Sequence, residues 1–469
     1  MKVPDIDRRR LLRVWKRVAS LSWPVMVEQV SRTLMRTVDI FVTALFSPLA
    51  VAAIGLADLY ARLPLRIGLG LGAGAIALSS QDTGSGATTN RDEAITQAIL
   101  IGALAGVPFV FFGIFLGEQA IAILGIWAEQ EEMAEVASLG GLYLAIIFAT
   151  APARHVALVG ARSLQGTGDT RTPMYVNLVS NTMNIVLSLV LGLGLLGAPR
   201  LTIVGVGIAT AAANVFTAGM LLLAIATPWT EASFVVPRQL VIARQLLVVS
   251  APKVLEGLVA TAIEFPFNSL LLFFGADVNA AYQIGHRVYQ QVTSPLSRGF
   301  SVGASVVVGQ ALGDGTPGDA RYNGWATAAL GLLTVGTIGI LLALAAEPLA
   351  GLFTDDPDTR LLAAGFAVTY GVVAPFTVLY VALAGSLQGG SDTRTPFIAR
   401  TFGLFVFYLC FSALTSVYLG WGVFGIYLGI FLYYVSAFCI VAVGFQYGGW
   451  AGRATRMMDD RGSEESPTD

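Results

Sequence analysis

The sequence predicts an all-α polytopic membrane protein with twelve transmembrane helices in two homologous six-helix lobes. Hydrophobic residues make up 55% of the 469 residues and charged residues only 12%, and the mean hydropathy is +0.71. A soluble domain carries about 25% charged residues. Apolar runs recur along the chain, and each is as long as the ~20 residues that cross a bilayer as a helix. The polar stretch Leu164–Pro173, LQGTGDTRTP, returns as LQGGSDTRTP at Leu387–Pro396, which indicates a duplication.

Hydropathy divides the chain into twelve expected spans, six in each half. Both copies of this loop motif follow an apolar run that contains a proline and precede another apolar run. Because each half has an even number of spans, we expect parallel repeats related by an axis along the membrane normal. The expected spans are 19–46, 49–80, 94–117, 136–163, 173–196, 201–227, 247–274, 277–310, 323–346, 361–387, 396–419 and 421–447.

Charge in the polar breaks predicts the orientation. The first 18 residues are rich in lysine and arginine, so the positive-inside rule places them in the cytoplasm, and an even span count returns the C-terminus there. Breaks with arginine alternate with the acidic breaks Glu118–Glu135 and Glu347–Asp358, which we expect outside; Arg200 is the exception. The expected parts are a basic N-terminus (1–18), two lobes (19–227 and 247–447), a linker between them (228–246) and a polar, disordered cytoplasmic tail (448–469).

The duplication extends beyond the loop motif. Pro24 and Glu28 open the first span, and Pro252 and Glu256 open the seventh with the same spacing. Within the motif itself, capping explains most residues. Asp169 and Asp392 are expected to accept hydrogen bonds from the next helix, with Pro173 and Pro396 at its first position. We therefore assign the motif to structure and not to the substrate site.

Four charged residues of the first span share one helix face. Glu28, Arg32, Arg36 and Asp39 fall within an arc of about 80° at about 100° per residue. Charges at mid-membrane are costly against lipid, so this face should point into the lobe or a cavity. Neutralisation within the pairs Glu28–Arg32 and Arg36–Asp39 is the simpler alternative. In the second span Asp58, Arg62 and Arg66 also share a face and could balance these charges.

Asp39 is the deepest of these charges and the candidate for ion coupling. A carboxylate binds sodium through oxygen, or a proton when burial favours its neutral form. The fifth span presents Asn177, Asn181 and Asn184 on one face. Their amides could ligate a cation or hold Asp39, or they could simply join helices by hydrogen bonds.

Several classes of function are excluded by what the sequence lacks. A net charge of −2 provides no nucleic-acid footprint, and the two histidines lie too far apart for a metal cluster. No hydrolase or nucleotide-binding motif occurs, so we expect no enzyme and no cofactor other than a coupling ion. Cys410 and Cys439 are expected as buried apolar residues. The expected partners are small-molecule substrates and the lipid bilayer, and we expect a monomer.

The combination of six plus six spans, the QGxGDTRTP loop with its echo, and the phrase VVGQALGDGTPGDAR at Val307–Arg321 resembles the multidrug and toxic compound extrusion (MATE) family. The resemblance is to a prokaryotic, DinF-like branch. It implies a multi-pass protein of the plasma (inner) membrane with both termini in the cytoplasm. It further implies an antiporter that exports amphipathic, often cationic, drugs or toxic metabolites in exchange for H⁺ or Na⁺ by alternating access.

The resemblance also assigns roles to residues of the N-terminal lobe. Asp39 matches the family's acidic residue of the first helix, which is associated with cation coupling, and we place Asn181 and Asn184 beside it. Thr210 matches another position near this site. Ser188 stands where many relatives carry aspartate, so the site has one carboxylate fewer. We therefore expect coupling to protons, with sodium bound at Asp39 and Asn184 as the alternative.

The C-terminal lobe offers secondary candidates for the substrate cavity. These are Glu256 and Glu264 in the seventh span and a polar, aromatic stripe in the eighth that includes Tyr282 and His286. Some branches of the family use an acidic residue of the seventh span for coupling. Glu264 could instead be a buried partner of Arg287 or His286.

Two other functions would require features that the sequence does not predict. A flippase for lipid-linked oligosaccharides or peptidoglycan precursors, of the same superfamily, should have fourteen spans or a strongly cationic cavity for pyrophosphate. Here we expect twelve spans and a cavity of mixed charge. An intramembrane enzyme should show a catalytic motif within its spans, and none occurs.

Overall fold

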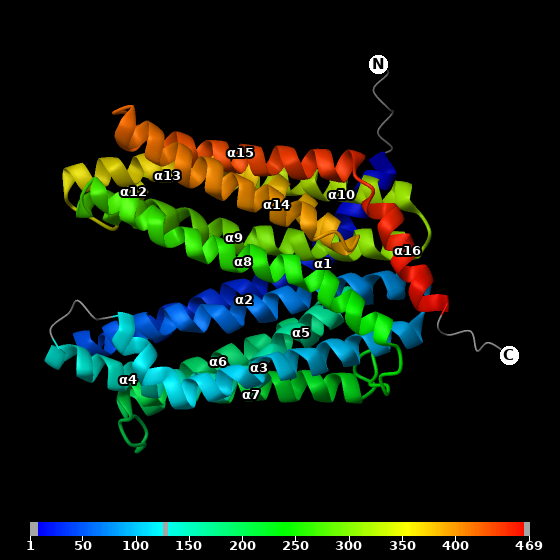
Figure 1. The fold of residues 1–469 in the computed structure, drawn as a ribbon, viewed down its shortest axis with the longest axis horizontal. Helices are drawn as coiled ribbons and strands as arrows, with labels where there is room; N and C mark the ends of the chain where they lie inside the picture. Colours follow the sequence, from blue (N-terminus) through cyan, green and yellow to red (C-terminus); the bar gives the residue numbers. More distant parts are fainter. Residues whose placement is uncertain (1–7, 125–129, 464–469) are drawn as a thin grey trace. The chain divides into compact units, whose positions relative to one another are not determined.

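A computed structural model describes residues 8–124 and 130–463, and within these ranges the chain is almost entirely helical (Figure 1). The described residues form two compact units. The C-terminal unit contains residues 8–26, 80–87 and 248–463, and the N-terminal unit contains 27–79, 88–124 and 130–247. The start of the first helix and the end of the second thus group with the C-terminal half of the chain. Residues 125–129, in the middle of the acidic break expected outside, lie beyond the described ranges.

The N-terminal half builds seven helices. A proline explains the break inside an expected span of this half: the fourth span divides at Thr150, because Pro152 stands in the first turn of a new helix, where its missing backbone donor is tolerated. The helices are α1 (Arg8–Ala44), α2 (Pro48–Ser85), α3 (Thr88–Leu124), α4 (Gln130–Ala149), α5 (Ala151–Thr167), α6 (Arg171–Leu193) and α7 (Thr202–Ala226).

The C-terminal half follows the same order, with π-helical turns inside the ninth and eleventh spans. Asp356 caps the tenth span by accepting a hydrogen bond from the Thr359 amide at 2.8 Å. The elements are α8 (Leu240–Phe273), α9 (Ala276–Gly313), α10 (Pro317–Gly331), η1 (Leu332–Gly336), α11 (Thr337–Leu344), α12 (Ala346–Ala350), α13 (Pro357–Gly389), α14 (Arg394–Phe402), η2 (Gly403–Phe411), η3 (Leu414–Tyr418), α15 (Val423–Tyr447) and α16 (Trp450–Ser463).

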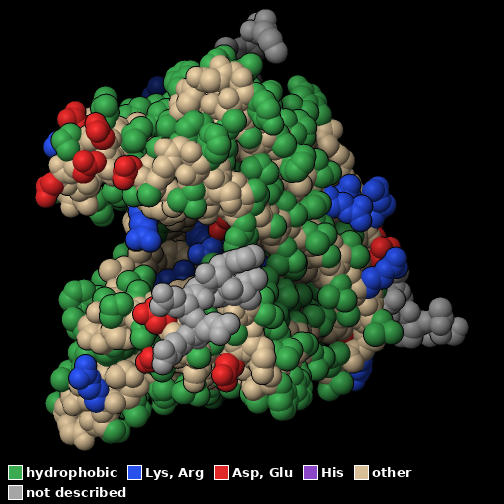
Figure 2. Space-filling view, turned by 60° about the vertical axis from the view of Figure 1, so that its left-hand side comes forward, with side chains coloured by type: hydrophobic (Ala, Val, Ile, Leu, Met, Phe, Trp, Pro, Cys, Tyr) green, Lys and Arg blue, Asp and Glu red, His purple; other side chains and the backbone are tan. Residues whose placement is uncertain are grey.

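Every expected span lies in helix. Ten helical stretches of the described residues are long and apolar enough to cross a membrane. The other two expected spans lie in α1 and α9, which are 37 and 38 residues long and carry more charge. Figure 2 shows hydrophobic side chains over much of the visible surface, as a membrane protein requires. Cys410 and Cys439 are exposed, so their expected burial was wrong.

The expectation of a disordered tail was wrong for residues 450–463, which form the helix α16. Trp450 and Arg461 are fully buried in the C-terminal unit, although α16 is rich in charge. The Arg461 guanidinium donates to Asp82 Oδ1 at 2.7 Å and to Gln81 Oε1 at 3.3 Å. Trp450 stacks on Phe445 with ring centroids 5.0 Å apart. The composition of the tail predicted solvation, whereas these few anchoring contacts fold it onto the bundle.

Both loop motifs act as helix caps, as predicted. Asp169 Oδ1 accepts the amides of Arg171 and Thr172 at 3.1 and 3.0 Å, and Asp392 Oδ1 accepts the Thr395 amide at 3.2 Å. The prolines stand at the third helical position and not at the first, because α6 and α14 begin at the arginines.

The two loops differ at one left-handed residue. Gly168 has φ 99° and its equivalent, Ser391, has φ 57°. A left-handed conformation costs a residue with a Cβ about 1 kcal/mol more than glycine. The Ser391 hydroxyl accepts a hydrogen bond from Gln81 Nε2 at 2.9 Å, which offsets that strain.

We expect Gly168→Ala to lower the free energy of unfolding by about 1 kcal/mol, because it adds strain without a new contact. Ser391→Gly should change it by less, since relief of strain and loss of the hydrogen bond oppose each other. Thermal denaturation midpoints of the purified variants test this. A larger loss for Ser391→Gly than for Gly168→Ala would contradict the comparison.

Candidate ion-coupling site

Asp39 lies at the meeting point of α1, α6 and α7 in the N-terminal unit. The Ser188 hydroxyl, on α6, donates to Asp39 Oδ1 at 2.8 Å. Asn184 lies one turn earlier on α6, and both α6 residues are fully buried. Spacing by four along α6 places both side chains on the face toward Asp39, as the sequence predicted.

The hydrogen bonds fix which way the Asn184 amide points. With its nitrogen toward Asp39, Nδ2 donates to Asp39 Oδ1 at 3.2 Å. Its oxygen then accepts from the backbone amide and the hydroxyl of Thr210, each at 3.3 Å. The opposite orientation would set acceptor against acceptor. Asp39, Asn184, Ser188 and Thr210 thus form one hydrogen-bonded group, which we call the Asp39 group.

Asn181 does not join the Asp39 group. Its side chain donates to the Ser31 hydroxyl at 3.1 Å, and Asn177 donates to the Pro173 carbonyl at 2.8 Å. These two amides therefore have the alternative role, which is hydrogen bonding within and between helices. The helical spacing located the correct face of α6 but could not determine which turn meets Asp39.

The charges around Asp39 are paired less than the sequence suggested. Glu28 and Arg32 form the expected ion pair, with Arg32 Nη2 and Glu28 Oε1 3.0 Å apart. Among the described residues, Arg36 and Asp39 form no ion pair, although they interact electrostatically. Asp39 is held by neutral donors.

The sequence analysis did not predict two half-buried arginines of the N-terminal unit. Arg154 and Arg162 of α5 interact electrostatically with the charges of α1. They were detectable, because they are eight residues apart, on one helix face, inside the apolar run of the fourth span. Arg162 Nη1 also donates to Gln165 Oε1 at 3.0 Å.

Glu256 of the C-terminal unit is a paired charge. It is 1% exposed and accepts from Lys253 Nζ at 2.9 Å and from Arg400 Nη1 at 2.9 Å. Arg400 was not predicted, because only the folded bundle brings α14 to α8. Both carboxylate oxygens of Glu256 already accept hydrogen bonds from cations. Asp39, in contrast, is held only by neutral donors. Glu264 is exposed, so its expected burial was wrong, and it interacts electrostatically with Tyr282.

Tyr282 and His286 belong to an aromatic cluster in the C-terminal unit. The hydroxyls of Tyr282 and Tyr408 are 2.8 Å apart. The His286 ring stacks on Tyr282 with centroids 5.5 Å apart, and Tyr370 lies 4.9 Å away by the same measure. These contacts join α9, α13 and the eleventh span.

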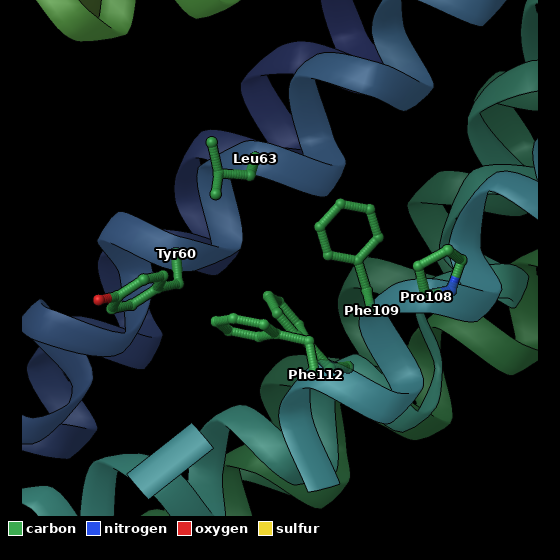
Figure 3. A pocket seen from close by; sticks show the side chains of 6 residues that line it. Tyr60, Leu63, Pro108, Phe109 and Phe112 are labelled. Atoms are coloured by element: carbon green, nitrogen blue, oxygen red, sulfur yellow. The ribbon is translucent and has the colours of Figure 1, made fainter. Parts of the chain in front are cut away.

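A separate apolar pocket of about 180 Å³ lies between α2, α3 and α4 (Figure 3). Phe109 and Phe112 of α3 project toward Tyr60 and Leu63 of α2 in this view. Tyr60 is on the face of α2 opposite Asp58 and Arg62, so this pocket is distinct from the charged face. It is lined by Tyr60, Leu63, Pro108, Phe109, Phe112 and Phe148.

A family comparison accounts for the repeat and the fold together. The MatE family model matches residues 24–190 and again residues 252–414. The two matches begin at Pro24 and Pro252, the same pair that marked the duplication. The chain belongs to the multidrug and toxic compound extrusion (MATE) family.

Relatives are found among bacterial MATE proteins named for multidrug resistance. The probable multidrug resistance protein NorM of Rhodopseudomonas palustris is 28% identical, over 87% of this chain and 87% of its own length. The multidrug resistance protein PmpM of Pseudomonas aeruginosa is 28% identical over 86% and 84%. These relatives confirm a prokaryotic MATE transporter, and the finer DinF-like placement stays a prediction.

Solved structures confirm the predicted fold class of twelve helices in two six-helix lobes. A crystal structure of MATE in complex with MaD3S has a TM-score of 0.84 at 20% identity, covering 96% of this chain and 98% of that chain. A MOP superfamily transporter from Pyrococcus furiosus has a TM-score of 0.82 at 20% identity, with the same coverage.

Proposed function

We propose that this MATE protein is a secondary antiporter that exports amphipathic compounds by alternating access, with Asp39 as the ion-coupling residue. The observation that carries the proposal is the Asp39 group: a membrane-embedded carboxylate held by the neutral side chains of Ser188 and Asn184. A change in the charge of such a group shifts the balance between two packings of the surrounding helices. Multidrug-resistance relatives support the class of substrate.

The geometry favours the proton as the coupling ion. Ser188 and Asn184 both donate to Oδ1 of Asp39, so Oδ2 is the oxygen that can take a proton without disturbing them. Sodium requires several oxygen ligands. To supply one, Asn184 would have to turn its amide over and give up both bonds from Thr210. Replacement of the family's second carboxylate by Ser188 points the same way.

Proteoliposomes loaded with a transported dye test the coupling ion. We expect an imposed pH gradient to drive dye movement at equal sodium on both sides, and a sodium gradient at equal pH to drive none. Ser188→Ala should then retain most transport, because the proton needs only Asp39. Transport that follows the sodium gradient alone, and that fails in Ser188→Ala, would replace the proton by sodium. No transport under either gradient would refute secondary antiport.

We further propose that both termini are cytoplasmic, as the charge of the polar breaks predicts. Cysteines would be placed at the exposed residues Glu132 and Glu231 after Cys410 and Cys439 are replaced by serine. In intact cells a membrane-impermeant maleimide should label position 132, and position 231 only after permeabilisation. Labelling of both positions from one side would rule out this topology.

One observation favours a second candidate, a flippase for lipid-linked precursors. We expected a cavity of mixed charge, but the charges that interact with one another in the N-terminal unit include five arginines and only three carboxylates. A pyrophosphate headgroup would suit such a surplus. Twelve spans and the multidrug-resistance relatives keep export of amphipathic compounds as the first candidate. Dye export and flipping of a lipid-linked precursor can be measured in the same proteoliposomes. Only dye export should be inhibited by a competing soluble amphiphile.

A further inference from the structure

Five arginines from three helices of the N-terminal unit form one electrostatic cluster at membrane depth. Arg36 interacts with Arg32, on its own helix, and with Arg62 of α2. Arg154 of α5 interacts with Arg36 and Arg32, and Arg162 of α5 interacts with Arg32. We call Arg32, Arg36, Arg62, Arg154 and Arg162 the arginine cluster.

The carboxylates of the same unit do not neutralise this cluster. The carboxylates that interact electrostatically with the cluster are Glu28, Asp39 and Asp58, which makes three negative charges against five positive ones. Glu28 is occupied by Arg32, and Asp39 by Ser188 and Asn184. Asp58 interacts electrostatically with Arg36 and Arg154.

Arg36 and Arg154 are the two members with the most unused hydrogen-bonding capacity. Among the described residues, neither forms an ion pair or a side-chain hydrogen bond. Arg36 is exposed and Arg154 is half-buried, so a ligand can reach both. The buried Tyr143 lies beside them and interacts electrostatically with both guanidinium groups. An arginine turned to lipid at this depth would be strongly disfavoured, so these groups require a polar surrounding.

We propose that the arginine cluster binds the acidic headgroup of an amphiphile, and that the exported compounds are anionic amphiphiles bearing a phosphate, sulfonate or carboxylate. This rests on the proposed export function and narrows its substrate class. A guanidinium is planar and donates two parallel hydrogen bonds to such groups. A cationic compound would instead meet five positive charges against three negative ones. The cationic substrates that the family resemblance implies are therefore disfavoured at this site.

The direction of transport agrees with this assignment. An anion that leaves a cell with a negative interior moves down the electrical gradient, as does a proton that enters in exchange. Protonation of Asp39 also makes the unit more positive. The charge of Asp39 therefore cannot expel an anion by direct competition, and the two ligands must be coupled through the packing of the helices.

Equilibrium binding to the full-length protein in phosphatidylcholine nanodiscs tests the proposal. The probes are decyl phosphate and decyltrimethylammonium, which share a tail and differ in the sign of the headgroup. We expect decyl phosphate to bind at least roughly tenfold more tightly, and Arg36→Gln or Arg154→Gln to weaken it roughly tenfold. Arg36→Lys and Arg154→Lys, which keep the charge but lose the planar pair of donors, should weaken the binding less than the glutamine variants do. Arg238→Gln, at an exposed loop residue, is the matched control and should leave it unchanged.

Tighter or equal binding of decyltrimethylammonium, or no binding of either probe, overturns the proposal. The proposal is also overturned if Arg36→Gln and Arg154→Gln both bind decyl phosphate as tightly as the wild type and both elute as folded protein. Nanodiscs with phosphatidylglycerol identify the source of the headgroup. If this lipid competes with decyl phosphate, the ligand is an anionic lipid. If it does not compete, the ligand is a soluble amphiphile. The assay needs no ion gradient, so its result is independent of the coupling experiment that tests export itself.

Discussion

Replacing Asp39 with asparagine is expected to abolish gradient-driven export while leaving the protein folded. Asparagine has the size of aspartate, and its side-chain oxygen can still accept from Ser188, which donates to Asp39 at 2.8 Å. The variant cannot gain or lose a proton, so the charge change that would bias the helix packing is gone. Dye export from proteoliposomes under a pH gradient measures the loss. Elution volume and thermal midpoint show that the protein is intact.

Variants of the residues that donate hydrogen bonds to Asp39 distinguish the role of the carboxylate from that of its donors. Asn184→Ala and Ser188→Ala each remove one donor to Oδ1, and water can replace a neutral donor. We expect a reduced rate in each, and not a complete loss. Asn181→Ala is the matched control, because Asn181 bonds Ser31 and lies outside the Asp39 group. Export by Asp39→Asn at the wild-type rate would remove Asp39 from the mechanism.

Helical periodicity predicted much of the Asp39 group but not its exact membership. Spacing along α6 places Asn181, Asn184 and Ser188 on one face, and that face does meet α1. Which turn lies opposite Asp39 depends on the axial offset and crossing angle of two helices. Neither quantity can be obtained from the sequence. Asn181 was therefore predicted beside Asp39, although it contacts Ser31.

The arginines show a second limit of sequence analysis. Several charged residues on one face of a single span, as in α1 and α2, are a clear signal in the sequence. Arg154 and Arg162 are the only Asp, Glu, Lys or Arg residues in their apolar run, and Arg400 is the only one in its own. Their importance appears only when separate helices are packed together. Arg400 reaches Glu256, which is 144 residues earlier in the chain, at 2.9 Å.

The tail shows how little apolar surface is needed to fold a polar segment against a preformed bundle. Composition predicted disorder for 448–469 because the segment is polar and holds several acidic residues. Yet Trp450 is fully buried against Phe445, and the Arg453 guanidinium lies 3.4 Å from Asp392. Composition averages over residues, whereas docking depends on the few that find partners.

Replacing Arg461 with alanine is expected to lower the free energy of unfolding of the C-terminal unit by about 3–5 kcal/mol, because it removes the cation beside a buried carboxylate. Asp82 is 2% exposed and accepts from Arg461 at 2.7 Å. Without Arg461, Asp82 must either stay charged in an apolar setting or draw water in. The C-terminal end of α16 then loses the contact that holds it to the bundle. The thermal midpoint in detergent should fall. Trypsin should then cleave α16 after Arg453 and Arg456 in protein that is otherwise folded.

A second substitution distinguishes an unpaired charge from simple loss of packing. In Asp82→Asn the charge of the buried carboxylate is already gone, so Arg461→Gln should cost much less there than it costs in the wild type. Arg456→Ala, at an exposed residue of the same helix, controls for helix propensity and should shift the midpoint little. If Arg461→Ala and Arg456→Ala shifted the midpoint equally, the buried pair would contribute nothing to holding α16. If instead Arg461→Gln were as damaging in the Asp82→Asn protein as in the wild type, the loss would come from packing of the Arg461 side chain, and Asp82 would not be the charge that it serves.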